Sequence, residues 1–164
     1  MSFVCRRYHS LKFALGFLLA GVLNTGAQEL VRVKQVVDGD TIILESGERL
    51  RLLGLNTPEV NHPKKPVEPF GKEAADFTRR MVEGKLVRLE FDPHVSKKDK
   101  YSRIFAYVFL QDGTFLNAEI IRLGYGFVII SNPPLKYEFE FVQLELNARK
   151  DRMGLWALPT AEKQ

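Results

Sequence analysis

Three side chains that carry oxygen ligands, Asp40, Asn56 and Glu59, stand where apolar stretches of this 164-residue chain begin or end. Hard cations such as calcium prefer several oxygen ligands, and backbone carbonyls and water complete the coordination shell. Each of these residues alone is also typical of a turn or a solvated surface. Because all three fall at the ends of neighbouring predicted strands, their pattern favours a calcium site.

Two arginines stand in unusual places for a cation. Arg51 lies between leucines in an apolar stretch, and Arg103 opens a second one, "RIFAYVF". Burying a guanidinium costs free energy unless it meets an anion, and its planar fork matches the oxygens of a phosphate. Taken singly, each arginine is equally consistent with a surface side chain whose stem lies along a barrel.

A metal site, one carboxylate and two arginines match one reaction, the cleavage of a phosphodiester. That reaction needs a positioned water, a group that accepts its proton, and cations that stabilise a highly charged transition state. Pro58 fixes its own backbone and keeps the preceding residue extended, which holds Glu59 in a defined place. Asp38, in the pair Asp38-Gly39, is instead predicted to be a turn residue.

The strands that must position these residues follow from the spacing of apolar side chains. Alternation of polar and apolar residues, as in "RLRL" at 49–52, is typical of a half-buried strand. Turns at Asp38-Gly39 and Ser46-Gly47 join the first three strands into a meander. The five predicted strands cover residues 31–33, 41–45, 49–52, 87–91 and 104–110.

Helical spacing of apolar residues predicts three helices, near residues 70–81, 116–123 and 135–146. In the third helix one apolar face is expected to consist of Leu135, Phe139, Val142 and Leu146. The first helix falls between the third and fourth strands. This order predicts an α+β protein that is mainly β: a five-stranded barrel of the oligonucleotide/oligosaccharide-binding (OB) type with three helices, a fold that often binds nucleic acid.

The first 27 residues have the composition of a secretory signal peptide. A basic head with Arg6, Arg7 and Lys12 precedes the 11-residue apolar run Phe13–Leu23, and small residues up to Ala27 follow. The alternative is a membrane anchor, but spanning a bilayer takes about 20 apolar residues. We therefore expect an exported protein, periplasmic or secreted, that is cleaved near Ala27 and contacts a membrane only through its leader.

Cleavage would leave residues 28–164 as one domain, and 45% apolar residues are enough for a core. The single cysteine, Cys5, belongs to the leader, so the mature chain has no thiol. Without the leader, 21 basic residues face 20 acidic ones, and the net charge falls from +4 to +1. The case for an anionic partner therefore depends on where individual charges lie.

Four motifs occur in one order along the chain: "DGDT", "RLLGLNTPE", "HPKKPVEPFGKEAADFT" and "DKYSRIFAYVF". With them, residues 29–157 closely resemble the staphylococcal-nuclease-like (thermonuclease) family. The resemblance implies a five-stranded barrel with three helices. It also implies a calcium-dependent endonuclease that cleaves DNA and RNA with little sequence specificity, and it points to a monomer without a stable protein partner.

The resemblance also implies roles for individual residues. It gives the metal three ligands: Asp40, Asn56 and the main-chain carbonyl of Thr57. Glu59 matches the carboxylate that acts on the attacking water, and Arg51 and Arg103 match the arginines that hold the cleaved phosphate. Contacts with the terminal phosphate of the nucleotide are implied for Lys65, Lys100 and Tyr101.

The chain departs from the family pattern in two places. Asn56 stands where an aspartate is usual, and Ile130 and Asn132 replace tyrosines that can pack near a base, which affects base preference and affinity. One alternative is therefore a nucleic-acid-binding barrel that has lost turnover through Asn56. Another is an oligosaccharide-binding barrel, which leaves the arginines unexplained. The combination of Arg51, Glu59 and Arg103 favours an enzyme, because binding alone does not need the carboxylate.

Overall fold

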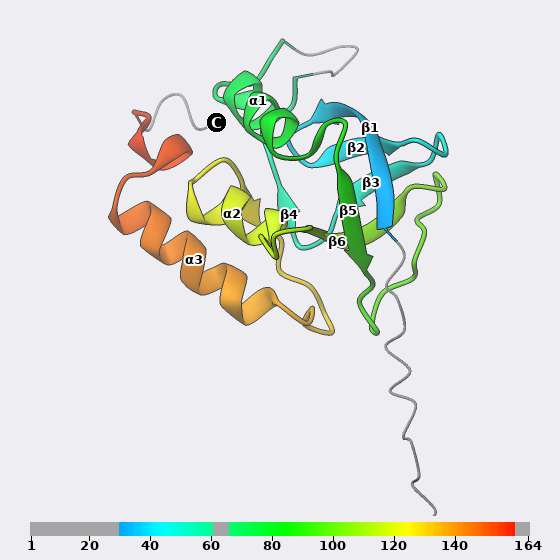
Figure 1. Ribbon diagram of the computed structural model, residues 1–164. Helices are drawn as coiled ribbons and strands as arrows, with labels where there is room; N and C mark the ends of the chain where they lie inside the picture. Colours follow the sequence, from blue (N-terminus) through cyan, green and yellow to red (C-terminus); the bar gives the residue numbers. More distant parts are fainter. Residues whose placement is uncertain (1–29, 61–65, 160–164) are drawn as a thin grey trace, which may run out of the picture.

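The computed structural model describes residues 30–60 and 66–159. The predicted leader and Lys65 lie outside these ranges. In the described part, five strands form a closed barrel in the order β1-β2-β3-β6-β5 (Figure 1). The barrel strands are β1 (Leu30–Asp38), β2 (Thr41–Leu44), β3 (Arg49–Leu52), β5 (Leu86–Glu90) and β6 (Ile104–Leu110). The neighbours pair antiparallel except β3 and β6, which are parallel.

Three helices complete the fold, as expected: α1 (Gly71–Val82), α2 (Leu116–Arg122) and α3 (Glu138–Lys150). Helix α1 connects β3 and β4 to β5 and packs against β1, whereas α2 packs against both α3 and β6 (Figure 1). A short 3-10 helix, Gly154–Ala157, follows α3. The predicted α+β fold with an OB-type barrel is confirmed. None of the described helices is both long and apolar enough to cross a membrane.

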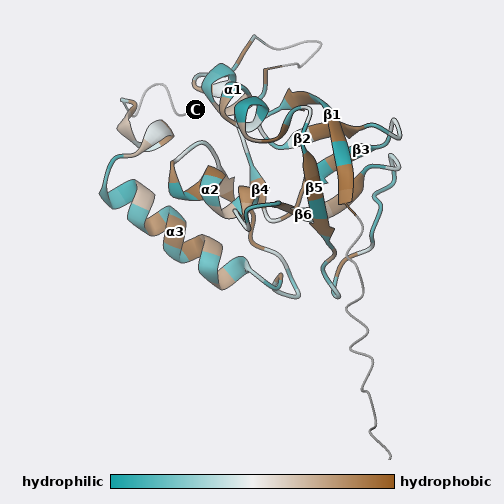
Figure 2. Cartoon of the chain, viewed as in Figure 1, coloured by the Kyte–Doolittle hydropathy of each residue, from teal (hydrophilic) through white to brown (hydrophobic). Residues whose placement is uncertain are grey.

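Strand β3 illustrates how sequence alternation places the chemistry. Leu50 and Leu52 are 0% and 1% exposed and belong to the hydrophobic core, which also includes helix residues such as Phe141 of α3. Figure 2 shows hydrophobic residues along the barrel strands. Successive side chains of a strand point to opposite faces. Arg49 and Arg51 therefore lie on the outer face of the barrel, next to each other along one strand.

Two short strands were not predicted. The apolar stretch after β3 does not continue to Asn56 as one strand, because the chain turns at Gly54, which has a φ of 83°. A Cβ at this glycine would lie 2.9 Å from the Phe141 ring, so the turn also fits closely against α3. Beyond it, β4 (Leu55–Asn56) pairs with β7 (Phe127–Val128). Two-residue strands are too short to produce a periodic pattern in a sequence.

The predicted apolar face of the third helix is wrong. Phe139 and Leu146 are 79% and 54% exposed, whereas Phe141 is fully buried. The reason is Glu145, a buried carboxylate on the inner face of α3 that accepts a hydrogen bond from the Val128 N–H and pairs with Arg149. A charged residue in this position interrupts the apolar spacing that would have identified the buried face.

Candidate active site

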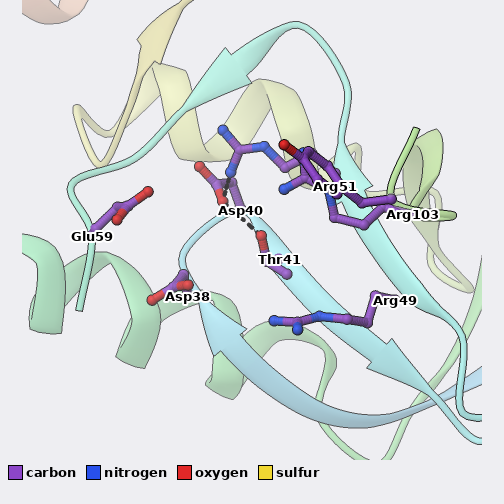
Figure 3. A pocket seen from close by; sticks show the side chains of 8 residues that line it. Asp38, Asp40, Thr41, Arg49, Arg51, Glu59 and Arg103 are labelled. Atoms are coloured by element: carbon purple, nitrogen blue, oxygen red, sulfur yellow. Dashed lines mark hydrogen bonds and ion pairs between the residues drawn. The ribbon is translucent and has the colours of Figure 1, made fainter. Parts of the chain in front are cut away.

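A cavity of about 560 Å³ opens on the outer face of the barrel, beside the turn from β1 to β2 and the start of β6 (Figure 3). It brings together Asp40, Arg51, Glu59 and Arg103, which the sequence predicted as a site. Among the described residues, the lining consists of Asp38, Asp40, Thr41, Arg49, Arg51, Glu59, Tyr101 and Arg103. Charged side chains of both signs therefore face one another in this cavity.

Asp40 is fixed in place just before β2. Its carboxylate is buried and accepts hydrogen bonds from the Thr57 N–H at 2.7 Å and from the Thr41 hydroxyl at 3.0 Å. The preceding turn packs closely against Thr57, because a Cβ at Gly39 would lie 2.8 Å from Thr57 Oγ1. The turn thus needs glycine at this position, and Asp40 has a preorganised orientation.

Arg51 connects the two predicted side-chain ligands of the metal. Its guanidinium forms an ion pair with Asp40 and donates a hydrogen bond to the amide oxygen of Asn56. Burial lowers the pKa of Arg51 to about 10; repulsion from Arg103 acts in the same direction, and attraction to Glu59 opposes it. At neutral pH the residue is still a cation. With its side chain 16% exposed, it is not a solvated surface arginine.

Arg103 precedes β6 and is oriented by Asp99. The Asp99 carboxylate accepts hydrogen bonds from Arg103 Nε at 2.7 Å and from the Arg103 N–H at 2.9 Å. Burial opposes ionisation of Asp99, but these hydrogen bonds outweigh it and lower the pKa of this carboxyl. Only one edge of the Arg103 guanidinium is used by this contact, so the other edge remains able to bind an anion in the cavity.

Glu59 is exposed, and its backbone is held firmly. The Glu59 N–H donates to a carboxylate oxygen of Glu68 at 3.0 Å, and its carbonyl accepts from the Glu68 N–H at 2.9 Å. Gly71, at the start of α1, lies close to the same carbonyl. Figure 3 shows the Glu59 carboxylate reaching into the cavity toward Asp40. A carboxylate on a fixed backbone in a charged cavity is suited to accept a proton from a water.

The oxygen donors around Asp40 are compatible with calcium. The described residues contain no group of three or more histidine, cysteine, aspartate or glutamate side chains that would hold a metal by themselves. Oxygens of Asp40 and Asn56 nevertheless converge on one positive charge, because both contact the guanidinium of Arg51. Thr57 follows Asn56 in the chain, and its backbone N–H donates a hydrogen bond to the Asp40 carboxylate. A carboxylate oxygen and an amide oxygen are donors of the kind that calcium prefers.

Two of the three predicted substrate contacts, Lys100 and Tyr101, lie in the part of the chain that the structure describes. Tyr101 lines the cavity and is 69% exposed, and the Lys100 ammonium lies 5.0 Å from the centre of its ring. Ile130 is 67% exposed, and neither it nor Asn132 lines the cavity. Lys65 falls in the range that the structure does not describe, so its predicted role stays a prediction.

Three residues of the lining were not predicted as part of a site: Asp38, Thr41 and Arg49. Asp38 ends β1, and its carboxylate accepts a hydrogen bond from the Val60 N–H at 3.2 Å. The expectation of a simple turn residue was therefore incomplete. In the sequence, the two aspartates of "DGD" could have indicated that Asp38 belongs to the site. They flank one turn, and both line the same cavity.

Comparisons with known proteins agree with this geometry. The family model described as "Staphylococcal nuclease homologue" matches residues 49–158. The Thermonuclease of Staphylococcus hyicus is 38% identical over 144 residues, which cover 86% of this chain and 83% of that protein. The Thermonuclease of Staphylococcus intermedius is 40% identical over 127 residues, or 76% of this chain and 74% of the relative. Endonuclease YncB of Bacillus subtilis (strain 168) is 31% identical over 131 residues, which cover 77% of this chain and 61% of that protein. The chain belongs to the staphylococcal nuclease family.

Proposed function

We propose that this protein is a nuclease that hydrolyses phosphodiester bonds in DNA and RNA. The observation that carries the proposal is the presence of Arg51, Glu59 and Arg103 in one cavity. A module that merely binds nucleic acid has no need for the carboxylate of Glu59 in a cavity that also contains two cations able to bind phosphate. The relatives named Thermonuclease and Endonuclease support the same reaction class.

In this proposal, different residues of the cavity carry out different parts of the reaction. Glu59 takes a proton from the attacking water, which makes the water a stronger nucleophile. Arg51 and Arg103 donate charge-assisted hydrogen bonds to the phosphate oxygens, whose negative charge grows in the transition state. Their partners Asp40 and Asp99 hold both guanidiniums in place before the substrate arrives.

Calcium is the proposed cofactor, with Asp40, Asn56 and the Thr57 carbonyl as its protein ligands. When bound, it would supply positive charge beside the phosphate and so assist the two arginines. Asn56 lowers the charge of this donor set by one relative to an aspartate. Calcium affinity rises with the charge of the ligands, so we propose a working but weak metal site.

Low sequence specificity follows from what the cavity offers to a substrate. Its charged groups are suited to bind a phosphate. The backbone phosphate is the same in DNA and in RNA and does not depend on the base. We therefore propose that the protein acts on either nucleic acid. We also propose that it acts as a monomer with no stable protein partner, because Arg51, Glu59 and Arg103 already meet in one cavity.

Export is a separate proposal that rests on the first 27 residues of the sequence. The basic head and the 11-residue apolar run support cleavage after Ala27. Mass spectrometry of the protein from its own host is expected to find Gln28 as the first residue. An intact Met1–Gln164 chain in a membrane fraction would contradict cleaved export.

The proposed activity is tested by incubating purified residues 28–164 with single-stranded DNA and RNA, in calcium and then in excess chelator. We expect both substrates to be cut in calcium and neither in the chelator. Binding without cleavage at every calcium concentration would favour the alternative, a nucleic-acid-binding barrel without turnover. Equal cleavage in calcium and in chelator would support the proposed nuclease activity and contradict its proposed dependence on calcium.

A further inference from the structure

Strand β3 carries a second arginine toward the cavity. Arg49 lies two residues before Arg51, so both point to the outer face while Leu50 between them is fully buried. Both arginines line the same cavity. In Figure 3, Arg49 extends along the opposite side of Thr41 from Arg51, toward Asp38.

Arg49 differs from the other two arginines because its charge is not paired within the described part of the chain. Arg51 is paired with Asp40, and Arg103 with Asp99. The Arg49 guanidinium is exposed and has no hydrogen-bond or ion-pair partner among the described residues. A cation that lines a substrate cavity without an internal counterion is available for an anionic group of the substrate.

The spacing of the arginines suggests which group this is. Residues two apart on a strand are separated by about 7 Å, which is comparable to the distance between neighbouring phosphates along one nucleic-acid strand. The outer face of the second and third strands is also where OB-type barrels bind oligonucleotides. A chain whose cleaved phosphate lies at Arg51 would therefore bring an adjacent phosphate within reach of Arg49.

We propose that Arg49 binds the backbone phosphate next to the one that is cleaved. This inference rests on the proposed nuclease function and adds the substrate class, because it makes the cavity selective for oligonucleotide and polynucleotide chains over an isolated phosphodiester. Arg51 and Arg103 act on every phosphodiester, whereas Arg49 acts only where a second phosphate follows. It is a specificity-determining residue that does not touch the reacting atoms.

The test compares two substrates: a thymidine dinucleotide with one phosphodiester and no terminal phosphate, and a single-stranded thymidine octamer. For the octamer, Arg49→Gln is expected to lower kcat/KM about tenfold, mainly through KM. For the dinucleotide, the variant should stay within about twofold of wild type because no second phosphate is present. Arg49→Lys should retain most of the octamer activity, since a point charge is enough for a backbone phosphate.

The matched control is Arg80→Gln, which removes an exposed arginine of α1 that does not line the cavity. A salt titration gives a second readout: the slope of log(kcat/KM) for the octamer against log[salt] should become less steep by about 0.7 in Arg49→Gln and stay unchanged in Arg80→Gln. An unchanged octamer rate, or equal losses on both substrates, would overturn the role of Arg49 and leave the nuclease proposal intact. If wild type cleaves neither substrate, the nuclease proposal itself fails, and the inference fails with it.

Discussion

The Arg51 guanidinium contacts the carboxylate of Asp40 and the amide oxygen of Asn56 at the same time. One cation thus joins strand β3 to the turn before β2 and to β4. The two oxygens that we propose as calcium ligands already face a common positive charge. In the proposed calcium site, metal binding would therefore be coupled to the position of Arg51, and the charge of residue 56 should affect both.

The first prediction concerns that charge. Asn56→Asp restores a second carboxylate, so we expect it to lower the calcium concentration for half-maximal cleavage by about tenfold. Asp40→Asn removes the one anionic ligand of the proposed metal site and should nearly abolish turnover. Calcium titrations of cleavage by the three proteins measure both effects. Wild-type activity that is absent at about millimolar calcium, but present in Asn56→Asp, would contradict a working site.

The second prediction concerns the shape of the two phosphate-binding cations. Arg103→Lys keeps the charge but loses the planar fork and the bond that Asp99 makes to Nε. We expect the rate to fall by roughly a hundredfold, or about 3 kcal/mol of transition-state stabilisation, and Arg51→Lys should behave similarly. Steady-state kinetics with Arg80→Lys as the control measure the loss. Activity within about threefold of wild type would place the arginine outside the reaction.

The third prediction concerns stability and pH. Asp92 is buried and accepts hydrogen bonds from the Tyr107 hydroxyl at 2.7 Å and from the Lys136 N–H at 2.8 Å, which ties β5 and its following loop to β6 and to the segment before α3. Burial alone would raise the pKa of this carboxyl, but the hydrogen bonds outweigh it and lower the pKa below its ordinary value. A carboxyl group whose pKa is lowered in the folded state stabilises the fold at any pH above its ordinary pKa. That contribution is lost as the pH falls from the ordinary pKa through the lowered pKa of the folded state.

Asp92→Asn should therefore lower the free energy of unfolding at neutral pH by about 2 kcal/mol, and its stability should depend less on pH below about pH 4. Urea unfolding at neutral and acidic pH measures both. Asp151→Asn, which changes an exposed aspartate at the end of α3, is the control. Identical acid dependence in wild type and Asp92→Asn would show that this carboxyl does not contribute to acid sensitivity.

Much of the fold was predictable because its strands follow simple rules. The "RLRL" of β3 alternates as a strand with one buried and one solvent-facing side must, and the barrel places Leu50 and Leu52 inside and the arginines outside. The predicted site residues Asp40, Arg51, Glu59 and Arg103 do meet in one cavity. This was within reach of the sequence because each of them begins, follows or lies within an apolar strand.

The parts that escaped prediction have local physical causes. Strands β4 and β7 have two residues each and leave no periodic signal. The inner face of α3 contains Glu145, whose hydrogen bond to Val128 joins segments 17 positions apart that no spacing rule connects. Arg49 looks in the sequence like any solvated arginine of an alternating strand. Only the position of the cavity distinguishes it.

In the proposed reaction, Glu59 accepts the proton of the water that attacks the phosphodiester. Glu59→Gln keeps the size of the side chain and one oxygen that accepts hydrogen bonds, but removes the basic carboxylate. The decisive measurement is single-turnover cleavage of single-stranded DNA in calcium, together with the Kd for the same DNA in excess chelator. We predict that Glu59→Gln cleaves at least about a hundredfold more slowly than wild type and binds the DNA with a similar Kd. Cleavage by Glu59→Gln at nearly the wild-type rate would contradict the proposed role of Glu59 as the base.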